Sequence, residues 1–240
     1  MSNNFFKFKQ FIVEQDKCAM KVTTDSCLFG SIVANAIKNT ALKIENCLDV
    51  GTGTGLLSLM IAQKNNQLKI DAIEIDEQAA MQAALNFRQS PFGNQLQIIC
   101  GDARKFLFNK KYNFIFSNPP FFEDDLKSVD VKKNIALHGS ELNLEELLQI
   151  IKNNLAFGGM FAILLPNHRS DYFEELCLKE YFYCNKKILV KQTPKHDYFR
   201  DILFFSTKNI SSLQEEIVIQ NNHQYTKEFI ELLKDYYLHL

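Results

Sequence analysis

Short apolar runs alternate with helical patterns along most of this 240-residue chain. The runs have the length of buried strands, and the segments between them carry apolar residues at helical spacing. Such alternation predicts an α/β fold, with a mostly parallel sheet covered by helices on both faces. We expect seven strands, at 45–50, 68–75, 96–100, 112–117, 160–165, 186–190 and 201–206, and helices at 26–38, 56–64, 77–88, 144–155, 171–179 and 227–238.

The ends of some elements carry their own signals. Ser26 is a candidate N-cap for the first helix, and Phe157-Gly158-Gly159 gives a C-cap signal after the helix at 144–155. A short polar segment, 192–197, joins the last two strands. We therefore expect these two strands to form an antiparallel hairpin at the edge of the sheet.

Composition narrows the class of protein. No stretch approaches the roughly 20 apolar residues of a membrane-spanning helix, and residues 1–11 alternate Phe with Lys instead of forming the apolar core of a signal peptide. The cysteines, at 18, 27, 47, 100, 177 and 184, form no C-x-x-C pair and have no zinc-binding spacing with histidine. We expect a cytoplasmic protein with buried cysteines and no metal site.

Basic residues gather in three segments, although the net charge is −1. These segments could converge on one face that binds phosphates, or they could be solvated side chains without a partner. The near-zero net charge argues weakly against a nucleic-acid partner. The residues are Lys7, Lys9, Lys17 and Lys21; Lys127, Lys132 and Lys133; and Lys186, Lys187, Lys191, Lys195 and Arg200.

A glycine-rich turn, Asp49 to Gly55, follows the first core strand. Its glycines, Gly51, Gly53 and Gly55, let the backbone turn sharply and approach a ligand without a Cβ in the way. The same turn could serve a dinucleotide, with pyrophosphate at the helix N-terminus. Asp49 favours S-adenosyl-L-methionine instead, because a carboxylate there would repel pyrophosphate but could indirectly hold an ammonium group.

Two more carboxylates follow the next strands. Glu74 ends the second strand roughly 20 residues after the turn, where a carboxylate accepts the ribose hydroxyls of a nucleotide. Asp76 is the alternative, although it is better explained as the cap of the next helix. Asp102 could accept a hydrogen bond from an adenine amino group, with the Ala103 N–H meeting a ring nitrogen. A simple helix cap is the alternative for Asp102.

The most specific motif is Asn118-Pro119-Pro120-Phe121, directly after the fourth strand. Two prolines cannot extend a central strand, so the chain leaves the sheet there. The Asn118 side chain and the Pro119 carbonyl could accept both N–H groups of an amine on an aromatic base, and so aim its lone pair at a methyl donor. Phe121 could stack on the base. A purely structural Pro-Pro corner is the alternative.

These motifs resemble the Rossmann-like, class I methyltransferases that act on amino groups and carry Asn-Pro-Pro-Tyr or Phe. Segments 8–11, 16–25, 48–57 and 117–122 resemble more closely the bacterial enzymes that methylate N6 of adenine 37 in valine tRNA. The resemblance implies S-adenosyl-L-methionine as cofactor, S-adenosyl-L-homocysteine as product, and the anticodon stem-loop of tRNA as partner. We also expect a monomer that binds neither a metal nor a membrane.

Carried over by position, the resemblance assigns roles to single residues. The target-base residues would be Asn118, Pro119, Pro120 and Phe121, and the cofactor residues would be Thr23, Thr24, Asp25, Asp49, Gly51, Gly53, Gly55, Glu74, Asp102 and Ala103. Two departures stand out. Phe121 occupies a position where most relatives have Tyr, and Leu137, before His138, stands where they often have Arg.

The resemblance also suggests how the chain is divided. We expect one methyltransferase domain over 1–240, in which 1–40 form an arm and a helix that cover the cofactor site, 45–206 form the catalytic core, and 225–240 form a terminal helix. Its length suits a single domain.

Rival functions stay open at this point. Similar motifs occur in enzymes that methylate guanine N2 in ribosomal RNA or the side-chain amide of a glutamine in release factors. A non-catalytic binding module would be expected to have a broken glycine turn or to lack Asn118, and both are intact. A nucleotide-dependent oxidoreductase would leave the Asn-Pro-Pro-Phe corner unexplained.

Overall fold

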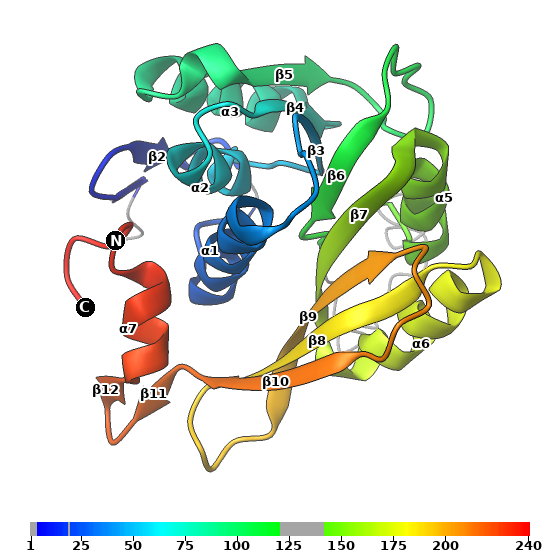
Figure 1. Ribbon diagram of the computed structural model, residues 1–240. Helices are drawn as coiled ribbons and strands as arrows, with labels where there is room; N and C mark the ends of the chain where they lie inside the picture. Colours follow the sequence, from blue (N-terminus) through cyan, green and yellow to red (C-terminus); the bar gives the residue numbers. More distant parts are fainter. Residues whose placement is uncertain (1–3, 19, 121–141) are drawn as a thin grey trace, which may run out of the picture.

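The computed structural model describes residues 4–18, 20–120 and 142–240. At its centre is an eight-stranded sheet in the order β10-β8-β9-β7-β6-β3-β4-β5, where β9 runs antiparallel to both of its neighbours (Figure 1). The mostly parallel α/β fold predicted from the alternating pattern is therefore confirmed. The strands are β3 (Asn46–Val50), β4 (Lys69–Glu74), β5 (Leu96–Cys100), β6 (Tyr112–Ser117), β7 (Leu155–Pro166), β8 (Tyr183–Lys191), β9 (Tyr198–Ser206) and β10 (Leu213–Val218).

Helices cover both faces of this sheet. One apolar cluster joins α1, α2, α3 and α7 to one face, and a second joins α5 and α6 to the other. Successive strand residues point to opposite faces, so that Cys47 packs in the first cluster and Leu48 in the second. The helices are α1 (Thr24–Asn39), α2 (Leu56–Lys64), α3 (Glu77–Gln89), α5 (Leu144–Asn154), α6 (Asn167–Lys179) and α7 (Lys227–Leu233), with a 3-10 turn at Gly93–Gln95.

The sheet has one strand more than the seven predicted. β10 pairs in parallel with β8, so the β8–β9 hairpin does not form the outer edge. The sequence pattern missed β10 because it is an edge strand whose side chains, apart from the buried Ile217, mostly face solvent. Ion pairs from Lys186 to Glu215 at 2.8 Å and from Lys191 to Glu216 at 3.2 Å attach it to β8.

Several predicted ends differ in the structure. Thr23, not Ser26, caps α1, because its hydroxyl accepts a hydrogen bond from the Ser26 N–H. Helix α5 ends at Asn154 and β7 begins at once, so Gly158, with φ of 72°, lies inside a strand and is no helix cap. Cys100 is exposed, in contrast to the buried cysteine expected, because it ends the edge strand β5.

The N-terminal arm packs against the end of the chain. A hairpin of β1 (Phe5–Lys7) and β2 (Ile12–Glu14) places Phe8 against Phe11 and Tyr237, with ring centroids 4.6 and 6.0 Å apart. A smaller hairpin, β11 (Gln220–Asn221) and β12 (Gln224–Tyr225), precedes α7. Across the described ranges, no helix has the length and apolar character needed to cross a bilayer.

Replacement of Phe8 by alanine tests how firmly the arm is held. Phe8 is 1% exposed, so the cavity left by its ring should lower the free energy of unfolding by about 3–5 kcal/mol. Phe5 in the same hairpin is 48% exposed, and Phe5→Ala should change it by less than about 1 kcal/mol. Denaturant unfolding of both variants measures the difference. A loss for Phe8→Ala as small as that expected for Phe5→Ala would show that the arm is not part of the core.

Candidate functional site

The glycine-rich turn between β3 and α2 depends on backbone that only glycine adopts readily. Gly51, Gly53 and Gly55 have φ angles of 73°, 55° and 82°. At Gly55 a Cβ would lie 2.4 Å from the Phe87 ring, so this glycine lets α2 and α3 pack closely. At Gly53 no described atom lies within 4 Å of the position of a Cβ, which leaves the turn open to a ligand.

Asp49 lies under this turn and is fully buried. One carboxylate oxygen, Oδ2, accepts hydrogen bonds from the hydroxyls of Thr52 at 2.6 Å and Ser58 at 2.7 Å. The other oxygen, Oδ1, is buried and receives no hydrogen bond from any described residue. Burial raises the pKa of Asp49 to about 6. A positively charged donor brought to the turn would therefore stabilise the ionised carboxylate.

Glu74, at the end of β4, is held beside the same turn. Its Oε2 accepts from the Gly53 N–H at 2.8 Å, and its Oε1 accepts from the Asp76 N–H at 3.0 Å. The carboxylate keeps lone pairs for further donors. Asp76 itself caps α3 by accepting from the Ala79 N–H at 2.7 Å, which agrees with the alternative given to it from sequence.

Asn118 follows the neighbouring strand β6 and is held in one orientation. Its Nδ2 donates to the Ser26 hydroxyl at 2.9 Å, and that hydroxyl contacts the Thr23 hydroxyl at 2.7 Å. The Asn118 Oδ1 is buried and, among the described residues, has no hydrogen-bond donor. Pro119 is buried and Pro120 is exposed. The amide therefore presents an unused acceptor at the same edge of the sheet as the glycine turn.

Comparison with known proteins identifies the chain's relatives. Residues 29–169 match the family model of the methyltransferase small domain. This chain belongs to that family. A Bacteroides fragilis protein named tRNA1(Val) (adenine(37)-N6)-methyltransferase is 39% identical to this chain, and the alignment covers 99% of each. A Trichodesmium erythraeum protein of the same name is 37% identical, again over 99% of each chain.

Solved structures share the fold of the methyltransferase at much lower identity. A "predicted O-methyltransferase" from Agrobacterium tumefaciens superposes with a TM-score of 0.68 at 13% identity, covering 88% of this chain and 96% of the other. The glycopeptide N-methyltransferase MtfA, complexed with S-adenosyl-L-methionine, superposes with a TM-score of 0.53 at 10% identity, covering 75% and 94%. At these identities the likeness supports the class I fold.

The cofactor of the methyltransferase is S-adenosyl-L-methionine, and the residues at the turn fit it. The buried Asp49 Oδ1 has no donor among the described residues, and the cofactor's amino acid end carries an ammonium group. The open space at Gly53 admits a ligand close to the backbone. Glu74, fastened to the turn through Gly53, would accept from the ribose hydroxyls. No group of three or more His, Cys, Asp or Glu in the described ranges is arranged to hold a metal.

Asp102 is already engaged by a residue that the sequence did not single out. Arg104 donates from Nε to Oδ1 at 2.8 Å and from Nη2 to Oδ2 at 2.9 Å, and its backbone N–H bonds Oδ1 at 3.0 Å. These bonds lower the pKa of Asp102. Arg104 also lies 3.4 Å from Glu146 on α5. Asp102 and Ala103 follow β5 in a turn rather than capping a helix, so the helix-cap alternative is wrong.

The three cofactor candidates near the N-terminus, Thr23, Thr24 and Asp25, make different contacts in the structure. Thr23 lies next to Asn118 through Ser26. Asp25 instead pairs with Arg200 on β9, whose Nε lies 2.9 Å from Oδ2, and Thr24 is the first residue of α1. From sequence, Ser26 is only a candidate helix cap. Its contact with Asn118 could not be found from sequence, because the two residues are 92 positions apart.

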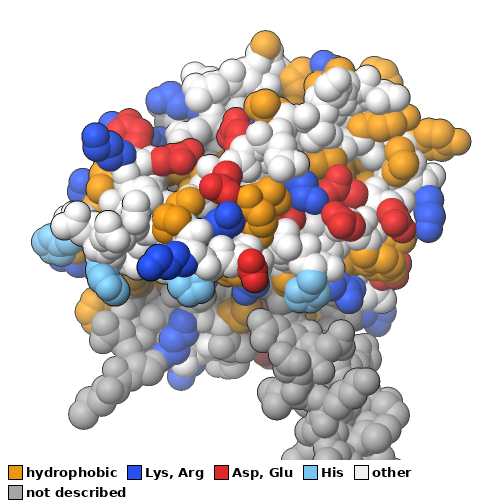
Figure 2. Space-filling model, turned by 90° about the horizontal axis from the view of Figure 1, so that it is seen from below, with side chains coloured by type: hydrophobic (Ala, Val, Ile, Leu, Met, Phe, Trp, Pro, Cys, Tyr) orange, Lys and Arg blue, Asp and Glu red, His pale blue; other side chains and the backbone are white. Residues whose placement is uncertain are grey.

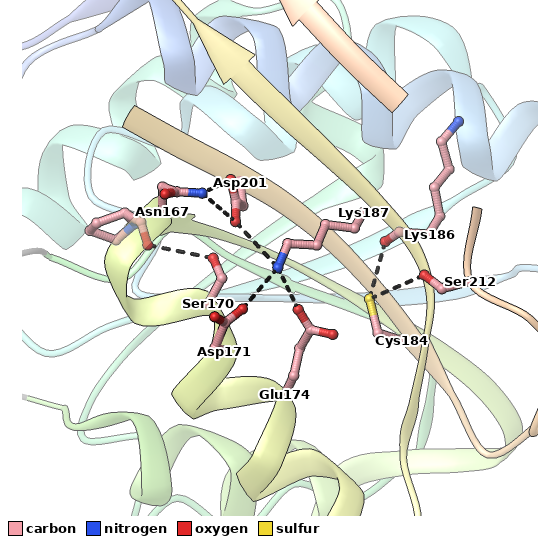
Figure 3. Close-up of polar contacts among 10 residues, drawn as sticks. Asn167, Ser170, Asp171, Glu174, Cys184, Lys186, Lys187, Asp201 and Ser212 are labelled. Carbon is pink, nitrogen blue, oxygen red and sulfur yellow. Dashed lines mark hydrogen bonds and ion pairs between the residues drawn. The ribbon is translucent and has the colours of Figure 1, made fainter. Parts of the chain in front are cut away.

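The third basic segment is largely neutralised. On the face shown in Figure 2, Lys and Arg side chains lie interspersed with Asp and Glu side chains. Lys187 on β8 lies 2.8 Å from Glu174 on α6 and 3.7 Å from the fully buried Asp201 on β9 (Figure 3). Although burial disfavours its charge, Glu174 and its neighbours raise the pKa of Lys187. This lysine therefore fastens α6 to the sheet and is not free for phosphate.

Some predicted residues lie outside the described ranges. Phe121, Lys127, Lys132, Lys133, Leu137 and His138 are among them. The roles given to them from sequence stay predictions.

Binding of S-adenosyl-L-homocysteine should depend on the charge of Asp49. Its pKa of about 6 means that the carboxyl is mostly protonated below that pH, and binding of an ammonium group must then release the proton. We expect the dissociation constant to rise by about tenfold for each pH unit below 6 and to be flat above 7. Calorimetric titration at steps of about one pH unit from pH 5 to pH 8 measures this.

The matched variant is Asp49→Asn, which keeps the shape and removes the titration. Its affinity should be weaker at pH 7 and independent of pH across the same range. A wild-type profile without a break near this pKa, or the same break in the variant, would exclude Asp49 as the titrating group.

Proposed function

We propose that this methyltransferase transfers a methyl group to N6 of adenine 37 in a valine tRNA. The support comes from relatives of that name at 37–39% identity over nearly the full length. The single structural observation that carries the proposal is the buried Asn118 Oδ1, which accepts no hydrogen bond from any residue that the structure describes. A cytoplasmic monomer that recognises the anticodon stem-loop is part of the proposal.

The residues around Asn118 suggest how the amine is activated. The amine of adenine is a poor nucleophile because its lone pair is delocalised into the ring. If Asn118 Oδ1 and the Pro119 carbonyl accept its two N–H groups, the nitrogen is drawn toward a tetrahedral state and its lone pair is aimed. The cofactor supplies a methyl group on a positively charged sulfur. Proximity and orientation then provide most of the rate, and the amine loses its proton readily after transfer.

In this proposal, the remaining candidate residues bind the cofactor. Asp49 and the glycine turn would hold the amino acid end, and Glu74 the ribose hydroxyls. Asp102, oriented by Arg104, and the Ala103 N–H would face the adenine ring of the cofactor. Residues 1–40 would form the arm and helix over this site, 45–206 the catalytic core and 225–240 a terminal segment that contains α7, within one domain.

Substrate RNA imposes its own requirement on the site. A base in an anticodon loop must leave its stack to reach a side chain at the edge of a sheet. Carboxylates already form ion pairs with Lys187, Lys191 and Arg200. We therefore expect phosphate contacts to come from other basic residues. Lys21 and Lys195 are exposed and remain candidates for such contacts.

Replacement of Asn118 by alanine should abolish methyl transfer and leave cofactor binding intact. Loss of one aligned acceptor should lower kcat by roughly 10²-fold or more, as removal of a preorganised hydrogen-bonding group does elsewhere. Transfer of labelled methyl to valine tRNA and titration with S-adenosyl-L-homocysteine measure the two effects. Asn66→Ala, at an exposed position after α2, is the control and should change neither. Retained transfer by Asn118→Ala would overturn the proposed role.

Mass spectrometry of nucleosides from bulk tRNA tests the substrate. Cells without the gene should lack N6-methyladenosine at one tRNA position, and the purified protein should restore it on a valine tRNA transcript but not on one with guanosine at position 37. Loss of N2-methylguanosine from ribosomal RNA, or of methylglutamine from a release factor, would select a rival function instead.

A further inference from the structure

Asn86 on α3 lies between the glycine turn and the N-terminal arm, and its side chain is fully buried. Its Nδ2 donates to the Thr54 carbonyl at 2.8 Å and to the Glu14 carbonyl at 3.0 Å. Its Oδ1 accepts from the Glu14 N–H at 3.0 Å. Both amide hydrogens are therefore used, and one side chain ties the arm to the turn.

Two more buried amides fasten the arm. Gln82, one helical turn before Asn86, accepts from the Lys17 N–H at 2.9 Å, and Gln15 accepts from the Val22 N–H at 2.8 Å. Both glutamines are 5% exposed. A buried amide that loses its partner leaves an unsatisfied polar group, so these contacts hold the arm in one arrangement.

The end of the arm leads directly to the target side of the site. Thr23 follows Val22 in the chain, and its hydroxyl contacts Ser26, which accepts from Asn118. Hydrogen bonds and chain connections therefore run without a break from the Thr54 carbonyl, in the glycine turn, to Asn118. The two halves of the site are linked through the arm as well as through the sheet.

We infer that Asn86 is a positioning residue, which couples cofactor binding to the placement of Asn118. The inference rests on the proposed function, in which Asn118 holds the target amine. A ligand that orders the glycine turn also fixes the Thr54 carbonyl, which strengthens the hold of Asn86 on Glu14. By linkage, a well-placed arm favours the ligand in return. The acceptor for the amine is thus fully ordered when the methyl donor is in place.

The Asn86→Asp substitution separates this role from simple packing. Aspartate has the shape of asparagine and can still accept from the Glu14 N–H, but it has no N–H for the two carbonyls. We expect about tenfold weaker binding of S-adenosyl-L-homocysteine and about tenfold lower kcat on valine tRNA, as for loss of a buried hydrogen bond. Gln78→Glu makes the same charge change at an exposed position of α3 and should change neither value.

Amide hydrogen exchange supplies a readout that does not depend on methylation. In the wild type, S-adenosyl-L-homocysteine should slow exchange at the amides of Glu14, Lys17 and Val22 by about tenfold. In Asn86→Asp at saturating ligand, this protection of the arm should be lost while the amides of α2 stay protected. Equal protection of the arm in the variant, or none in the wild type, would overturn the inference.

A second variant applies if Asn86→Asp does not fold. Gln15→Met keeps the length of the side chain and removes the acceptor for Val22, while Asn86 and the turn are unchanged. We expect lower kcat and, because the coupling is reciprocal, weaker binding of S-adenosyl-L-homocysteine. If both values are unchanged, the coupling is contradicted. Failure of the proposed function would be distinct, because the wild type would then not methylate valine tRNA although the ligand still protected the arm.

Discussion

The pairing of β3 between two parallel strands is the constraint on which the site depends. β3 is bonded to β4 on one side and to β6 on the other, and four of its five residues are buried. Neighbouring parallel strands end at the same edge of a sheet, where ligands bind in open α/β folds. The glycine turn after β3, Glu74 at the end of β4 and Asn118 after β6 therefore meet at one edge. A shift in this strand register would move these three groups apart.

Two buried acceptors distinguish this edge from a purely structural corner. Asp49 Oδ1 and Asn118 Oδ1 are both buried and receive no hydrogen bond from the described residues. Leaving such an acceptor unpaired costs about 1–3 kcal/mol, and a cofactor ammonium and a target amine would each supply the missing donor. The other polar atom of each side chain is hydrogen-bonded. Asp49 Oδ2 accepts from Thr52 and Ser58, and Asn118 Nδ2 donates to Ser26. The polarity of the site thus matches a cation on one side and an amine on the other.

The fold was largely predictable because its core strands carry short apolar stretches, and glycine or proline lies at or just beyond the ends of β3, β5, β6 and β7. The elements that were missed lack such a signal. β10 is polar and mostly exposed, and it is placed by its parallel pairing with β8, with ion pairs between the two strands. The C-cap expected at Gly158 failed because β7 already pairs with β6 at Leu155, and Gly158 lies in the register irregularity between that pair and the next one, at Met160. In both cases a contact with a distant strand outweighed the local pattern.

The amino-acid sequence alone determined the chemistry that the chain carries. A glycine turn after a strand, a carboxylate after the next, and Asn118 with Pro119 each have a local physical meaning that no fold is needed to see. Only the tertiary structure decided what orients them. Arg104 holds Asp102, Ser26 holds Asn118, and Asn86 joins the arm to the turn. Hydrogen bonds between side chains far apart in sequence leave no periodic trace, because their geometry exists only after the sheet and its helices have packed.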